Sequence, residues 1–181
     1  RRPAQEKGLR WYGVVDLWVG CHDGFGGDGK TVWPAERWGT DDYEMCIARC
    51  AFPGIELQKR PNRYVERQLG EIEQVAQSSP PELLYVLEPI REDWGRAPPG
   101  EFQALDFFVE NLNRLDLGKD TVIRLRPHPS AAPGKSAGWI PDHRSLNICL
   151  DSAIGVAWSP GRPKWAAGLE SVALAPARAA G

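Results

Sequence analysis

A regular alternation of short apolar runs and longer amphipathic segments fills residues 82–181 and constrains the fold more than any other feature of the chain. Short apolar runs bounded by turn residues predict buried strands, and apolar residues three and four positions apart predict helices. The expected strands are 82–89, 121–126, 145–151 and 163–168, and the expected helices are 101–117 and 170–180. Strands that alternate with helices predict an α/β fold with a parallel sheet.

The first part of the chain contains the same two kinds of segment. Residues 12–20 are rich in β-branched and aromatic side chains and predict a strand, and residues 55–58 predict a second, shorter strand. Residues 40–52 predict a helix, because Thr40 is a suitable N-cap residue and two acidic residues follow it in the first turn. We therefore expect α/β structure here as well.

A domain boundary is expected near Ser-Ser-Pro-Pro at 78–81, which breaks a helix predicted over 60–77. We divide the chain into the end of an N-terminal α/β domain at 1–59, a linker helix and break at 60–81, and a second α/β domain at 82–181. No strand follows the last expected helix, so we expect the second domain to be incomplete and the sequence to be a fragment of a longer protein.

Residues Gly24–Thr31, GFGGDGKT, match the phosphate-loop pattern of nucleotide triphosphatases. A phosphate loop joins a strand to a long helix that starts at its Gly-Lys-Thr. Pro34 and Gly39 follow within about one and a half turns, which is too short for a stable helix. We interpret the segment as a glycine-rich turn and keep a phosphate-loop NTPase as an alternative.

Composition favours a protein that binds neither nucleic acid nor the membrane interior. The formal net charge is -2, so there is no general electrostatic attraction to nucleic acid. The sequence has no apolar run of about 18 residues, and its first residues lack the apolar core of a signal peptide. We expect a cytoplasmic protein without a transmembrane segment, and leave peripheral membrane association and the oligomeric state open.

The four cysteines allow two interpretations. Cys46 and Cys50 lie one helical turn apart, so they could hold a metal ion together with Cys21 and His22. Structural zinc sites, however, usually contain a pair of ligands with tighter spacing. We interpret the cysteines as small buried thiols and expect no metal site.

Polar residues follow the expected strands of the second domain at the edge where parallel sheets bind ligands. Glu88 follows the first strand. Arg126 and His128 end the second strand and can face an anion, while Pro127 and Pro129 stiffen the loop between them. The alternative for His128 is a histidine that merely caps a loop carbonyl.

The last expected helix begins at Glu170 and Ser171, directly after Gly168. Helix N-termini bind phosphate through unpaired N–H groups and partial positive charge, and Gly168 would let a ligand approach the backbone. Ser171 can donate its hydroxyl, whereas Glu170 either accepts sugar hydroxyls or is an ordinary first-turn acid. We expect the His-Pro loop and this helix start to hold a phosphate or diphosphate from two sides.

From about residue 60 onward the chain resembles the nucleotide-binding half of bacterial glycosyltransferases with two Rossmann domains (GT-B type). The matching pieces include PNRYVERQLGEI, LLYVLEPI, GEFQALDFF, IRLRPHPS, Lys135 with Trp139, and AAGLESVALAPARAAG. The His-Pro loop and the serine at the helix start are similar to those of bacterial sialyltransferases and related surface-polysaccharide transferases. The resemblance implies a Rossmann-like second domain preceded by the tail of a first α/β domain.

The resemblance also implies an activity. The chain would transfer a sugar, such as sialic acid or a related sugar, from a CMP- or UDP-sugar to a hydroxyl of a glycan acceptor, without a tightly bound cofactor. His128, Ser171 and Arg126 would stabilise the leaving phosphate. The nucleotide-binding set is expected to comprise Glu88, Arg126, His128, Pro129, Gly168, Glu170 and Ser171.

Two motifs depart from that family. Glu170-Ser171 stands where the sialyltransferases have Ser-Ser or Ser-Thr, and His22-Asp23-Gly24 keeps only one acid of their two-acid general-base motif. Asp23 is therefore the candidate base that deprotonates the acceptor. A nucleotide-sugar epimerase of the same fold and a non-catalytic binding fragment remain alternatives.

Overall fold

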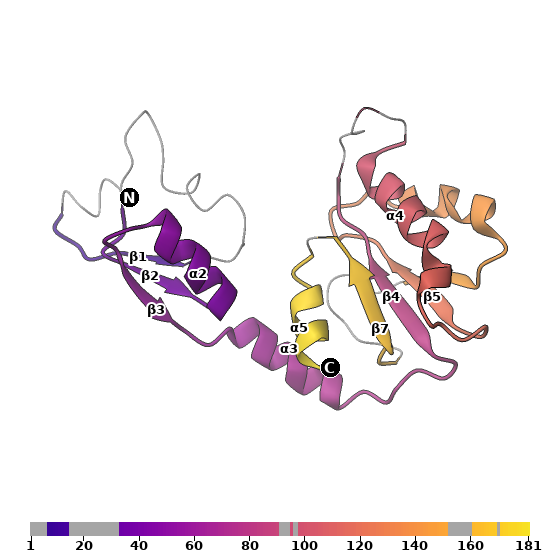
Figure 1. Cartoon of the computed structure of the whole chain (residues 1–181), viewed down its shortest axis with the longest axis horizontal. Helices are drawn as coiled ribbons and strands as arrows, with labels where there is room; N and C mark the ends of the chain where they lie inside the picture. The colour runs from indigo at the N-terminus through magenta and orange to yellow at the C-terminus, as the bar shows by residue number, and fades with distance from the viewer. Residues whose placement is uncertain (1–6, 15–32, 91–94, 96–97, 152–160, 170) are drawn as a thin grey trace. The chain divides into compact units, whose positions relative to one another are not determined.

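The computed structural model describes residues 7–14, 33–90, 95, 98–151, 161–169 and 171–181. The chain divides into two compact units, Arg1–Tyr64 and Val65–Gly181. Both are α/β units with parallel sheets, which confirms the fold class predicted from the alternation of apolar runs (Figure 1). None of the helices in the described part of the chain is long and apolar enough to span a bilayer.

The first unit contains a parallel sheet of three strands in the order β1-β2-β3. The strands are β1 (Tyr12–Val14), β2 (Glu36–Gly39) and β3 (Glu56–Lys59), and helix α2 (Asp42–Ala51) follows β2 (Figure 1). Ala48 of α2 and Phe52 just after it form the small core, against which Trp11, Ala51, Ile55 and Leu57 pack. Strands β1 and β3 and the helix overlap predicted segments, whereas β2 was not predicted.

Helix α2 begins one residue later than the sequence predicts. Its N-cap is Asp41, whose side chain accepts a hydrogen bond from the Glu44 backbone N–H at 2.7 Å. Thr40, the predicted cap, instead donates its backbone N–H to the Glu44 carboxylate at 2.6 Å. The reciprocal bonds between the start of the helix and Glu44 satisfy backbone donors that would otherwise be unpaired.

The second unit contains a parallel sheet of four strands in the order β6-β5-β4-β7. The strands are β4 (Glu82–Val86), β5 (Val122–Arg126), β6 (Ile148–Leu150) and β7 (Trp165–Gly168), and all four fall within predicted strands. Every residue of β4 is buried, as expected for a central strand covered on both faces.

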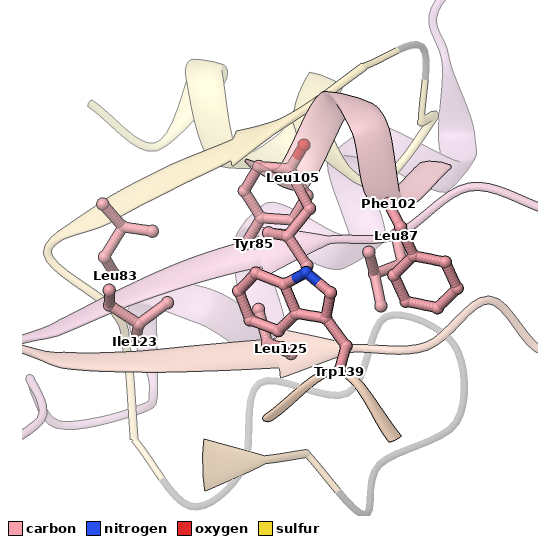
Figure 2. Close-up of a cluster of buried hydrophobic side chains, with 8 residues drawn as sticks. All are labelled: Leu83, Tyr85, Leu87, Phe102, Leu105, Ile123, Leu125 and Trp139. Carbon is pink, nitrogen blue, oxygen red and sulfur yellow. The ribbon is translucent and has the colours of Figure 1, made fainter. Parts of the chain in front are cut away.

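Side-chain alternation along β4 sends residues to two separate cores. Leu83, Tyr85 and Leu87 face one core, which Figure 2 shows together with Phe102 and Leu105 of helix α4 (Gly100–Glu110), Ile123 and Leu125 of β5, and Trp139. Trp139 lies between two short 3₁₀ helices, η3 (Lys135–Gly138) and η4 (Ile140–His143). Helix α4 is shorter than predicted, because the Asn111 side chain donates to the Phe107 carbonyl and a 3₁₀ turn, η2 (Leu112–Arg114), follows.

The opposite face of β4 packs against helices α3 (Arg63–Glu73) and α5 (Leu174–Ala179). Ile72 of α3 and Ala173 before α5 are buried against Leu84 and Val86. The helix that the sequence assigns to a linker thus contributes to the core of the second unit.

Candidate functional site

The strand order places a topological switch point between β4 and β7. From β4 the chain moves outward on one side through β5 to β6, and then returns to the other side of β4 to form β7. This is the order of the first four strands of the Rossmann sheet, 3-2-1-4. Ligands of open α/β sheets bind beyond the carboxyl ends of the strands at such a point. The second unit is therefore a Rossmann-like α/β domain whose candidate site lies at this edge.

Glu88 lies just beyond the end of β4, the strand next to the switch point. The ladder with β5 extends one residue past the strand, because the Leu87 N–H donates to the Arg126 carbonyl at 2.9 Å. Glu88 is half-buried, and its Oε1 is shielded from solvent with no hydrogen-bond partner among the described residues. A shielded carboxylate oxygen without a donor is costly, so it suits a ligand hydroxyl or N–H.

His128 lies beyond the end of β5, and its ring orientation is fixed by the turn that follows. The Ser130 backbone N–H donates to His128 Nδ1 at 3.1 Å, and Ser130 Oγ lies 2.9 Å from the same atom. Because Nδ1 accepts from a backbone N–H, the proton of the neutral ring resides on Nε2. Nε2–H has no partner among the described residues and can donate to an anion. Pro129, between these two residues, is exposed.

Arg126 forms a buried ion pair at the end of β5 that the sequence did not predict. Its guanidinium is buried and donates twice to Asp151 Oδ2, from Nε at 2.8 Å and from Nη2 at 2.7 Å. The side chains of this ion pair are only 4% and 2% exposed. A buried charge needs a partner, and the pairing of Arg126 with Asp151 joins the ends of β5 and β6.

Gly168 has a structural reason to be glycine that the sequence did not reveal. A Cβ at this position would lie 2.8 Å from the Val86 carbonyl oxygen and 3.4 Å from Leu174 Cδ1. The absence of a side chain therefore lets the end of β7 pack closely against β4 and α5.

The last helix does not begin at Glu170-Ser171. Helix α5 begins at Leu174 and has six residues, so the predicted phosphate-binding helix start is wrong. Ser171 precedes a turn in which its Oγ accepts from the Ala173 N–H at 3.4 Å and its carbonyl accepts from the Leu174 N–H at 3.0 Å. Its hydroxyl proton remains a donor near the switch point. Glu170 lies outside the described residues.

Lys135 and Trp139, which carried part of the family resemblance, hold η3 and η4 against α4. Lys135 forms an ion pair with the buried carboxylate of Glu101, in the first turn of α4. Trp139 Nε1–H donates to Asp106 Oδ1 at 2.6 Å, and the Trp139 ring stacks on His143 with centroids 3.7 Å apart. The ion pair of Lys135 with Glu101 thus ties η3 to the first turn of α4.

The phosphate-loop segment Gly24–Thr31 and the candidate base Asp23 lie outside the described residues. The chain that follows is described, and residues 33–35 are non-helical before strand β2 begins at Glu36. A phosphate loop requires a long helix directly after its Gly-Lys-Thr, and the described residues that follow do not form one. This disfavours the NTPase alternative.

The described thiols are less buried than the sequence predicts. Cys46 and Cys50 are exposed and Cys149 is half-buried, so the interpretation of Cys46 and Cys50 as buried thiols is wrong. Burial raises the pKa of the Cys149 thiol, an effect that the nearby Arg124 guanidinium opposes. Cys21 lies outside the described residues. Within the described part of the chain, no three His, Cys, Asp or Glu residues cluster as metal ligands would.

A hollow of about 380 Å³ lies in the first unit, at the amino ends of β2 and β3. Its lining comprises Trp33, Pro34, Ala35, Phe52, Pro53, Gly54 and Ile55. None of these residues was predicted to bind a ligand, and the hollow lies opposite the edge where parallel sheets bind ligands.

Comparisons of the chain with protein-family models, curated proteins and solved structures found no match. The class that the fold defines is an α/β protein with a Rossmann-like second unit.

Proposed function

We propose that the chain belongs to a glycosyltransferase that uses a nucleotide-sugar donor, and that the carboxyl edge of the second sheet binds that donor. The observation that carries the proposal is the pairing, on adjacent strands, of a hydrogen-bond donor for phosphate with an acceptor for hydroxyls. His128 supplies Nε2–H, and Glu88 supplies a shielded carboxylate oxygen without a partner. A phosphorylated sugar or nucleoside needs both kinds of contact.

The spacing of the strands supports a two-sided grip on a phosphate. His128 follows β5 and Ser171 follows β7, and these strands flank β4. Neighbouring strands lie about 4.8 Å apart, so the two strand ends are separated by roughly 10 Å. That span leaves room for one phosphate group held by the imidazole and the hydroxyl, and Glu88, which follows the strand between them, would accept a ribose or sugar hydroxyl next to the phosphate.

The transfer that this arrangement supports is a displacement at the anomeric carbon. The acceptor oxygen forms a bond to that carbon while the bond from carbon to phosphate oxygen breaks. Negative charge then grows on the leaving phosphate, where hydrogen bonds from His128 and Ser171 stabilise it. The acceptor loses its proton to a carboxylate, a role that the sequence assigns to Asp23.

A nucleotide screen tests the proposal. The melting temperature of the full chain is measured with CMP, UDP, GDP, ADP and ATP, and with the corresponding nucleotide sugars. A ligand at about 100 times its dissociation constant stabilises the folded state by about 2.7 kcal/mol. We expect CMP or UDP and their sugars to raise the melting temperature. The proposal fails if no nucleotide or nucleotide sugar does so, or if ATP alone stabilises in a manner that Lys30→Ala abolishes.

A further inference from the structure

Two exposed thiols share the outer side of α2. Cys46 and Cys50 are exposed, whereas Met45 and Ala48 face the core of the first unit. Residues four apart in a helix lie one above the other, with Cβ atoms about 5–6 Å apart. The capping bonds of Asp41 and Glu44 fix the start of this helix, so the spacing of the two thiols is held by regular helical backbone.

The chemistry of this pair selects a particular kind of ion. A thiolate sulfur lies about 2.3 Å from a bound metal, so two sulfurs at helical spacing can reach one ion from opposite sides. Thiolates prefer soft ions such as Cu(I). Zinc needs four ligands, and the described residues offer no third His, Cys, Asp or Glu beside this pair.

We propose that Cys46 and Cys50 form a two-coordinate thiolate site for a soft monovalent metal ion of the Cu(I) type. On binding, two S–H bonds break, two sulfur–metal bonds form and two protons pass to solvent, without any change in oxidation state. The complex carries one net negative charge.

The test is an anaerobic competition between the full chain and a chromogenic Cu(I) chelator, followed by the absorbance of the chelator complex. We expect the chain to withdraw one equivalent of Cu(I), and Cys46→Ser or Cys50→Ser each to weaken binding at least about tenfold through loss of one of the two thiolates. Cys149→Ser is the matched control and should bind as the unaltered chain does. Circular dichroism of each variant verifies that the helices persist.

A spacing variant separates chelation from the mere number of thiols. The double variant Tyr43→Cys with Cys46→Ser keeps two thiols on the same side, because Tyr43 is 67% exposed. It places them seven residues apart, about 10.5 Å along the axis, which is too far for one ion. We expect it to bind as weakly as Cys46→Ser.

Three results would overturn the proposal. The first is that the chain withdraws no Cu(I) from the chelator. The second is that Cys46→Ser and Cys50→Ser both bind as tightly as the unaltered chain. The third is that the spacing variant retains full affinity.

Discussion

Breaking the ion pair between Arg126 and Asp151 tests how the ends of β5 and β6 are held together. Both side chains are almost fully buried, and two hydrogen bonds of 2.7 and 2.8 Å join them. Asp151→Asn removes the negative charge that pairs with the buried guanidinium. Loss of one partner of a buried pair costs about 3–5 kcal/mol, a large fraction of the roughly 5–15 kcal/mol by which a domain is stable.

Urea unfolding measures this cost. With a slope of about 2 kcal/mol per molar, the midpoint of the second unit should fall by about 2 M in Asp151→Asn. The control is Arg67→Ala, which breaks the exposed pair between Arg67 and Glu71, whose side chains are 71% and 51% exposed. Exposed pairs contribute about 0.2–1 kcal/mol, so its midpoint should fall by less than about 0.5 M.

The double variant Arg126→Met with Asp151→Leu removes both buried charges and should recover most of the lost stability, because buried pairs can be replaced by apolar residues at little cost. The reasoning is refuted if Asp151→Asn shifts the midpoint no more than Arg67→Ala does. It is also refuted if the double variant is less stable than Asp151→Asn.

Three further perturbations test local features. Gly168→Ala should destabilise the second unit by about 1–3 kcal/mol in urea unfolding, because its Cβ meets the Val86 carbonyl at 2.8 Å; an unchanged midpoint would contradict the close packing. Burial raises the pKa of Tyr85 to about 12 from an ordinary value of 10.0, so the neutral phenol stabilises the folded state below pH 10, and this contribution is lost as the pH rises toward 12. Tyr85→Phe should abolish that part of the alkaline loss, and an identical pH profile would refute it. Asp41→Ala should lower the free energy of unfolding by about 1 kcal/mol, because it removes the cap of α2. An unchanged unfolding transition, followed by circular dichroism, would contradict this expectation.

The strands of the second unit were predictable because their hydropathy and burial agree. Leu83, Tyr85 and Leu87 alternate with Leu84 and Val86, and both sets are buried, so β4 reads as a continuous apolar run. The parallel arrangement followed from the helices between the strands.

Strand β2 was missed because it buries charged residues. Glu36 is only 5% exposed and accepts a hydrogen bond from Trp38 Nε1–H at 2.6 Å, while the Arg37 guanidinium carbon lies 3.8 Å from the centroid of the Phe52 ring. The first contact lies within β2, and the second joins β2 to the residue that follows α2. A pattern of apolar and polar residues cannot reveal such contacts, since it reflects only how often each residue type is buried in general.

The start of the last helix was misplaced although a signal for it was present. Proline is tolerated only in the first turn of a helix, where its missing N–H is not needed. Pro176 is the third residue of α5, so the helix begins at Leu174. Had Pro176 been used to set the start, Ser171 would have been placed in the preceding turn.

In the candidate site, too, some features were predictable from the sequence and others were not. The positions of Glu88 and His128 at the carboxyl ends of β4 and β5 follow from strand prediction alone, and the structure agrees with both. The commitment of Arg126 to Asp151 depends on the pairing of β5 with β6, which brings together residues 25 positions apart. A local sequence pattern does not reveal which distant residue will pair with a charged side chain.

Nucleotide binding by variants of His128 tests the central claim most directly. The affinity of the full chain for CMP and UDP is measured by calorimetry, together with His128→Ala, His128→Gln and the control Lys119→Ala, which lies in the turn before β5, at the opposite end of that strand from His128. We predict that His128→Ala weakens binding about tenfold or more, as expected for loss of a hydrogen bond to a charged group. His128→Gln, which retains an N–H donor, should recover part of the affinity, and Lys119→Ala should have no effect. Equal affinity of His128→Ala and the unaltered chain for both nucleotides would contradict the assignment of this edge as the donor site.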